Sequence, residues 1–213
     1  MFIGHFAVGF AGKAAVPKTS LGTLFLAAQF LDLLWPTLLL LNVEHATVAP
    51  DAANLTPIDF TDYPISHSLL TVLGWGLLFG LVYWWLQKDG RAALVLGLLV
   101  VSHWFLDLIV HVPDLPLYPG NSPKVGFGLW NSVAGTVLLE GLLFAGGIWL
   151  YLRTKRAAAT QASVALWVLV AFLVLVYLAN IFGPAPTNMT AVAWAGQLQW
   201  LLVVWAYWAD RQI

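Results

Sequence analysis

Long apolar runs are the feature that most constrains this chain. Each run is about 20 residues long, carries few charged side chains and is separated from the next by a polar connector. An α-helix rises about 1.5 Å per residue, so a run of this length can cross about 30 Å of hydrocarbon. We expect six membrane-spanning helices, at residues 21–41, 66–87, 92–112, 129–151, 165–182 and 191–208.

The composition agrees with that class. Hydrophobic residues make up 61% of the 213 residues and charged residues only 9%, too few to cover the surface of a soluble domain. We therefore predict an all-α, polytopic membrane helix bundle that forms a single domain over residues 1–213. Residues 2–16 are apolar but too short to span, and Pro17 ends the run, which indicates an additional short re-entrant or amphipathic helix.

The basic residues indicate the orientation of these spans. One side of the predicted membrane receives only Lys124, and the other receives Lys13, Lys18, Lys88, Arg91, Arg153, Lys155, Arg156 and Arg211. By the positive-inside rule, the basic side and both termini face the cytoplasm. A net charge of −1 and the lack of a basic run argue against a nucleic-acid partner, whereas the sequence leaves the oligomeric state open.

Three ionisable residues interrupt the third run, in the segment SHWFLDLIVH. His103, Asp107 and His111 are spaced by four, so a helix would place them on one face. A charged side chain at this depth costs at least a few kcal/mol, and such residues usually face the bundle interior and serve a function. A His and an Asp one turn apart are also a suitable pair of metal ligands.

Other polar side chains reach a similar depth. Counting about 1.5 Å per residue from the basic end, residues of three runs lie roughly 18–30 Å above it: Asp32, His103, Asp107, His111 and Glu140. His5 joins them if the first helix is re-entrant, and His67 begins the second span. Their agreement in depth predicts a polar centre inside the bundle.

Residues near this predicted centre have more ordinary interpretations. Glu44 and His45 fall in a polar connector, where we expect solvated side chains. Ser66 and Ser68 flank His67 and could support it, but we expect them to cap a helix.

The chain contains no cysteine, so His, Asp and Glu must supply any metal ligands. His103 and His111 would be about 12 Å apart along a helix axis, which is too far for one ion with bonds near 2 Å. Two arrangements remain open: a two-metal centre bridged by Asp107 or Asp32, or one ion held by His67, His103 and Asp107. Zn²⁺ is the first choice for such ligands, with Mn²⁺ or Fe²⁺ as alternatives.

Four short motifs resemble a known family. GHF at residues 4–6, Asp32, SHS at 66–68 and SHWFLD at 102–107 are similar to motifs of the LexA-regulated, inner-membrane metal-dependent hydrolases of the YdjM-like family. The resemblance covers about the first half of the chain. It implies a bacterial inner-membrane location and a metal site formed by His5, Asp32, His67, His103 and Asp107.

The chain departs from the family pattern at two points. It has LLWP where the family has a second acidic residue and a His after Asp32, and it has Asp62 where the family has the first His of its HRGxTHS motif. Asp62 is therefore a candidate replacement ligand. The SHxxxD pattern is also similar to that of helical zinc phospholipases C and nucleases, which implies phosphoester substrates.

These residues predict a membrane-embedded hydrolase that acts on a lipid or amphiphilic phosphoester through a metal-activated water. Asp32 or Glu140 would act as the base if it is not a ligand, and Lys124 would hold a phosphate. The alternative is a transporter that moves protons or divalent metal through the same His and Asp residues. A third interpretation is a polar core that only fixes helix packing.

Cysteine labelling tests the predicted orientation. Because the chain has no native cysteine, Lys124→Cys and Lys88→Cys each introduce a single thiol. In intact cells, a membrane-impermeant maleimide should label the thiol at position 124 and spare the one at position 88. The opposite pattern would invert the predicted orientation.

Overall fold

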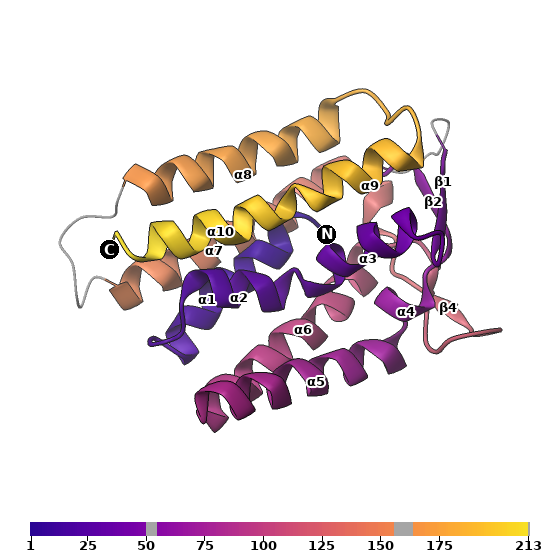
Figure 1. Ribbon diagram of the computed structural model, residues 1–213. Helices are drawn as coiled ribbons and strands as arrows, with labels where there is room; N and C mark the ends of the chain where they lie inside the picture. Colours follow the sequence, from indigo (N-terminus) through magenta and orange to yellow (C-terminus); the bar gives the residue numbers. More distant parts are fainter. Residues whose placement is uncertain (50–54, 156–163, 213) are drawn as a thin grey trace.

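A computed structural model describes residues 1–49, 55–155 and 164–212 of the protein. It is mostly helical, and its longer helices lie roughly along a common axis, with connections at both ends (Figure 1). The helices are α1 (Ile3–Ala15), α2 (Leu21–Ala28), α3 (Phe30–Leu40), α4 (Pro64–His67), α5 (Leu69–Gln87), α6 (Gly90–Val110), α7 (Val133–Lys155), α8 (Val164–Phe182), α9 (Met189–Gln197) and α10 (Gln199–Asp210). Arg156, one of the basic residues used to predict the orientation, lies outside the described residues.

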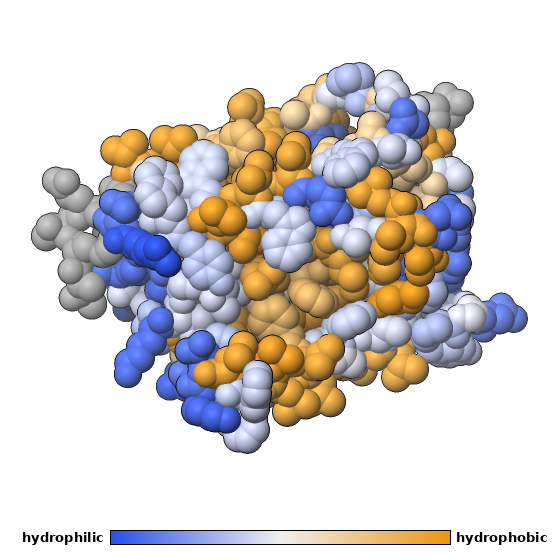
Figure 2. Space-filling model, viewed as in Figure 1, coloured by the Kyte–Doolittle hydropathy of each residue, from blue (hydrophilic) through white to orange (hydrophobic). Residues whose placement is uncertain are grey.

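The prediction of an apolar helix bundle is confirmed. Within the described residues, five helical segments are long and apolar enough to cross a membrane: α5, α6, α7, α8 and α9 together with α10. The pair α2 and α3 makes a sixth if it counts as one bent span. Apolar side chains cover much of the flank of the molecule, and hydrophilic ones gather toward the two ends (Figure 2). These features suggest a multi-pass membrane protein.

Two short antiparallel hairpins depart from the all-α prediction. Strand β1 (His45–Val48) pairs with β2 (Ile58–Asp62), and β3 (Leu115–Pro116) pairs with β4 (Lys124–Val125). Both lie at the same end of the bundle, opposite the carboxyl terminus (Figure 1).

Some predicted span boundaries also differ. The second predicted span divides into α4 and α5, because the Ser68 hydroxyl accepts the backbone N–H of Thr71 and begins a new helix. The fourth begins at Val133, after a short 3₁₀ turn at Leu129–Asn131. The polar ends of these runs therefore form caps and turns instead of continuing the helix.

The first predicted span is broken at Gln29, where α2 and α3 meet at an angle of 56°. Ala28 ends α2, so its carbonyl is among those that a helix end leaves without an intrahelical partner. Within α3, Pro36 has no N–H to donate to the carbonyl of Asp32, and Gln199 Nε2 donates to that oxygen at 3.4 Å instead. The bend therefore exposes backbone carbonyls inside the bundle and places Asp32 beside the break.

The short helix α1 packs inside the bundle, against α7. A Cβ added at Gly147 would lie 2.3 Å from the carbonyl oxygen of Ala7, so only glycine permits this close approach. Glu140 Oε2 also accepts the backbone N–H groups of Phe2 at 2.9 Å and Gly4 at 3.1 Å. These contacts fix the start of α1 and bury His5 completely.

Helices α5 and α6 are in close contact through glycines. A Cβ added at Gly97 would lie 2.8 Å from the carbonyl oxygen of Gly76, and the reciprocal distance is also 2.8 Å. Gly80 lies one turn further along α5, where its added Cβ would be 2.9 Å from the carbonyl oxygen of Ala93. Small residues at such positions allow two helices to approach backbone to backbone.

We expect Gly97→Ala to push α5 and α6 apart and to lower the free energy of unfolding by about 1–3 kcal/mol, as overpacking usually does. Thermal unfolding of the purified protein in lipid nanodiscs measures the loss. Gly74→Ala is the matched control, because a Cβ there meets nothing within 4 Å. Equal melting temperatures for the two variants would contradict the close contact.

Candidate metal centre

Five side chains from four helices meet inside the bundle. His5 comes from α1, Asp32 from α3, His67 from α4, and His103 and Asp107 from α6. Two groups of three have ligand atoms within 4.8 Å of one another and could hold a metal ion: His5, His103 and Asp107, and Asp32, His67 and His103. The predicted polar centre thus includes two overlapping groups that share His103.

A hydrogen bond at Nδ1 fixes the orientation of the His103 ring. Its Nδ1 lies 2.8 Å from the carbonyl oxygen of Ala28, and because a carbonyl only accepts, Nδ1 carries the proton. In a neutral imidazole this leaves the lone pair on Nε2, which lies 3.2 Å from Asp107 Oδ2 and 3.6 Å from Asp32 Oδ1. This buried Nε2 makes no hydrogen bond.

His67 is held in the same way by a longer chain of contacts. Glu44 Oε2 accepts the hydroxyl of Ser66 at 2.6 Å, so the Ser66 oxygen is free to accept from His67 Nδ1 at 2.7 Å. The neutral His67 ring then presents its Nε2 lone pair to the centre. That atom lies 3.8 Å from both Asp32 Oδ1 and Asp107 Oδ2, which is too long for a hydrogen bond.

Four lone-pair atoms therefore face one another, two imidazole nitrogens and two carboxylate oxygens. The four nitrogen–oxygen distances between them are 3.2, 3.6, 3.8 and 3.8 Å. Ligands at about 2.0–2.2 Å from a tetrahedral ion are about 3.3–3.6 Å from each other. These four distances are close to that spacing, and Asp32, His67 and His103 form one of the two groups whose ligand atoms all lie within 4.8 Å of one another.

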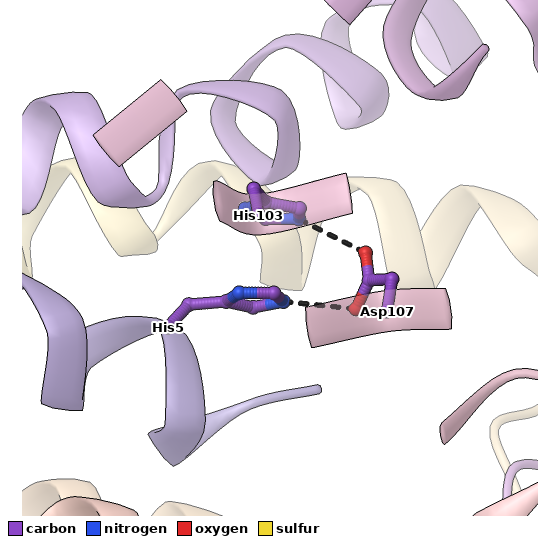
Figure 3. Close-up of side chains that lie close together, drawn as sticks. All are labelled: His5, His103 and Asp107. Atoms are coloured by element: carbon purple, nitrogen blue, oxygen red, sulfur yellow. Dashed lines mark hydrogen bonds and ion pairs between the residues drawn. The ribbon is translucent and has the colours of Figure 1, made fainter. Parts of the chain in front are cut away.

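His5 approaches the other oxygen of Asp107. Its Nε2 lies 3.0 Å from Asp107 Oδ1, and its ring stacks on His103 with centroids 3.5 Å apart and planes 7° apart (Figure 3). The amino group of Met1 also donates to Asp107 Oδ1. Asp107 Oδ1 therefore accepts from both His5 Nε2 and the Met1 amino group, while Asp107 Oδ2 faces His103.

Exposure differs among the five side chains. His5, His67, His103 and Asp107 are buried, whereas a quarter of the Asp32 side chain (25%) is exposed. Among these residues, Asp32 marks the side of the centre that water or a substrate can reach.

The structure places the other predicted site residues outside both groups. Asp62 ends β2 with an exposed side chain, 3.9 Å from His45 Nδ1. Lys124 lies in the exposed strand β4, and its Nζ donates to the carbonyl of Thr61 at 3.2 Å. Glu140 lies in α7 and binds the start of α1, as described above.

His111 belongs to a separate cluster at the end of α6. Its Nδ1 pairs with Asp114 Oδ1 at 2.8 Å, and its ring lies 4.1 Å from that of Trp130. The Tyr63 hydroxyl donates to the same Asp114 oxygen, and burial together with this carboxylate raises the pKa of Tyr63 well above its usual value. The sequence prediction missed Asp114, although its i, i+3 spacing from His111 was a usable signal.

Glu44 corrects one sequence expectation. The prediction of a solvated side chain is wrong, because Glu44 is only 1% exposed. Its Oε1 accepts the backbone N–H groups of Ile65 at 2.7 Å and Ser66 at 2.8 Å, at the amino-terminal end of α4. A helix start offers unpaired N–H donors and favours a carboxylate, which compensates for the burial. His45, by contrast, is exposed as expected.

Comparison with known proteins adds no relative to this geometry. The chain matches no family model, no curated protein and no solved structure. The chemistry of the centre is therefore inferred from its own residues.

We expect Glu140→Ala to lower the free energy of unfolding by about 1–3 kcal/mol, because it leaves two buried backbone N–H groups without an acceptor. Glu140→Gln keeps an oxygen acceptor and should recover most of the loss. Chemical denaturation in detergent micelles measures both variants. An alanine variant as stable as the wild type would show that Glu140 does not anchor α1.

Proposed function

We propose that this protein is a membrane-embedded, metal-dependent hydrolase whose ion is bound by His67, His103, Asp32 and Asp107. The observation that carries the proposal is the set of four facing lone-pair atoms, with both imidazoles oriented by acceptors on their far nitrogens. Two carboxylates in an apolar interior require a nearby positive charge. A divalent ion supplies it at the centre of the four atoms.

The Met1 amino group already supplies positive charge at Asp107 Oδ1, and protonation of His103 is the competing source at the oxygens that face the two imidazoles. The proton would then lie on Nε2, yet this atom makes no hydrogen bond even though Asp107 Oδ2 is only 3.2 Å away. This geometry favours an ion between the ligands over a shared proton.

The ligand set supports Zn²⁺ first, with Mn²⁺ or Fe²⁺ as alternatives. When bound, such an ion lowers the pKa of a coordinated water to about 7 and provides a nucleophile. Asp32, on the exposed side, is placed to orient that water or accept its proton. His5, His103 and Asp107 form the other group that could hold an ion, if the Met1 amino group leaves Asp107 Oδ1, so the protein would bind one or two.

The substrate class is inferred from the helices and the sequence motifs. The apolar helices suit a substrate that is a lipid or an amphiphile, and the hydrolase-like motifs around His67 and His103 favour a phosphoester bond. Lys124, at the hairpin end, is placed to attract a phosphate group before it enters. A bacterial inner membrane with the carboxyl terminus in the cytoplasm agrees with the basic residues at the opposite end. The amino terminus departs from the prediction that both termini face the cytoplasm, because the amino group of Met1 is buried inside the bundle beside Asp107.

Transport of a proton or a divalent metal is the second candidate. The near-complete burial of four of the five side chains would suit an occluded ion. A carrier, however, must open the site to each side in turn, and many transporters do so with internal repeats that this chain lacks. This difference favours hydrolysis.

Metal content tests the site. Elemental mass spectrometry of the purified protein should find one or two Zn, Mn or Fe per chain in the wild type and none in His103→Ala. His111→Ala is the matched control, because it removes a buried histidine that pairs with Asp114 and should keep the metal. A wild-type protein without metal, even after reconstitution with added ions, would refute the proposed centre.

Turnover tests the reaction. Wild-type protein loaded with metal should release product from a phospholipid or another lipid phosphoester in vesicles, and Asp32→Asn should lower the rate by at least about 100-fold, as expected for loss of a ligand or base. Saturable ion flux across the vesicles without product would instead assign the centre to transport.

A further inference from the structure

The structure connects the metal centre to a buried carboxylate that lies outside it. Glu44, Ser66 and His67 form a continuous hydrogen-bonded chain, 2.6 Å from carboxylate to hydroxyl and 2.7 Å from hydroxyl to imidazole. We propose that Glu44 and Ser66 are positioning residues that direct His67 Nε2 into the metal site. This inference rests on the proposed function, since it assigns a role relative to the same metal.

The donors and acceptors in this chain of hydrogen bonds can be assigned in only one way. Glu44 Oε1 already accepts two backbone N–H groups, and its Oε2 accepts the Ser66 hydroxyl, as an ionised carboxylate does. Because the Ser66 hydroxyl donates its proton to the hydrogen bond with Glu44, Ser66 Oγ can only accept a hydrogen bond from the N–H at His67 Nδ1. The three residues are at most 5% exposed, so water competes little for these bonds.

His67 depends on such support more than His103 does. His103 projects from the middle of α6, a helix of 21 residues, whereas His67 ends α4, a helix of only four. Helix α4 is too short to be stable by itself. Glu44 therefore has two effects, since one oxygen caps the backbone of α4 and the other orients the imidazole through Ser66.

The cap and the positioning role can be separated experimentally. Ser66→Ala removes the hydroxyl but keeps the backbone N–H groups that Glu44 Oε1 accepts. His67 Nδ1 then loses its acceptor, and the ring can rotate or move its proton to Nε2. Loss of an outer partner of a metal-binding His usually weakens metal affinity about 10–100-fold.

Glu44→Gln provides a second and sharper variant. The Gln carbonyl can keep the cap on α4 while its NH₂ group donates to Ser66 Oγ. The Ser66 hydroxyl would then donate to His67 Nδ1, which reverses the chain and places the imidazole proton on Nε2. We expect this nearly isosteric variant to fold and to bind metal at least as weakly as Ser66→Ala.

The experiment is a titration of full-length protein in lipid nanodiscs with Zn²⁺ against a competing chelator, with thermal unfolding measured in parallel. Ser66→Ala and Glu44→Gln should raise the Kd for Zn²⁺ about 10–100-fold, and Ser66→Thr, which keeps the hydroxyl, should stay close to the wild type. Ser68→Ala is the matched control, since it removes the cap of α5 beside the same histidine and should lower the melting temperature with an unchanged Kd.

The outcomes separate the two proposals. Tight Zn²⁺ binding by the wild type and equally tight binding by Ser66→Ala and Glu44→Gln would overturn the positioning role and leave the metal centre in place. An equal loss of affinity in Ser68→Ala would also overturn it, by showing that any disturbance of this segment has the same effect. No Zn²⁺ binding by the wild type would overturn both proposals.

Discussion

Two buried carboxylates facing two imidazole lone pairs are the constraint on which the rest of the structure depends. The Met1 amino group pairs with Asp107 Oδ1, but Asp32 Oδ1 and Asp107 Oδ2 would still repel each other and the lone pairs of His67 and His103 unless a cation lies among them. The surrounding fold holds this unfavourable arrangement in place. The break after α2 provides the Ala28 carbonyl behind His103, and the break between α4 and α5 leaves His67 at a helix end where Ser66 can reach it. Irregular backbone inside the bundle thus serves to orient the candidate ligands.

Helix α1 also affects the candidate metal centre, because it brings His5 against His103. The glycine contact with α7 and the anchoring by Glu140 bring the His5 ring onto that of His103, 3.5 Å away. Two imidazoles at this distance repel each other when both are charged, so the stack disfavours simultaneous protonation of His5 and His103. A neutral imidazole is the form that binds a metal. Asp107, with one oxygen toward each ring, links α1 to the centre (Figure 3).

Sequence spacing predicted the parts of the centre that belong to regular helices. His103 and Asp107 share a face of α6 because they are four residues apart, and apolar runs indicated most of the long helices. The same spacing fails at His111, because α6 ends at Val110 and His111 has extended dihedral angles (φ −61°, ψ 144°) that lead the chain away from the helix. Glu44 could not be predicted either, since it contacts Ser66 across 22 positions and nothing local distinguishes it from a solvated loop residue. Hydropathy likewise contains no signal for the bend at Gln29.

X-ray absorption at the metal edge tests the central claim most directly, because it reports which atoms surround the ion. For the zinc-loaded protein in lipid nanodiscs, we expect nitrogen and oxygen ligands at about 2.0–2.2 Å together with the outer-shell scattering of two imidazole rings. Loss of one ring's contribution in His67→Ala, with the ion still bound, would identify that ring. A shell of oxygen atoms without imidazole scattering would show an ion bound elsewhere and contradict the proposed centre.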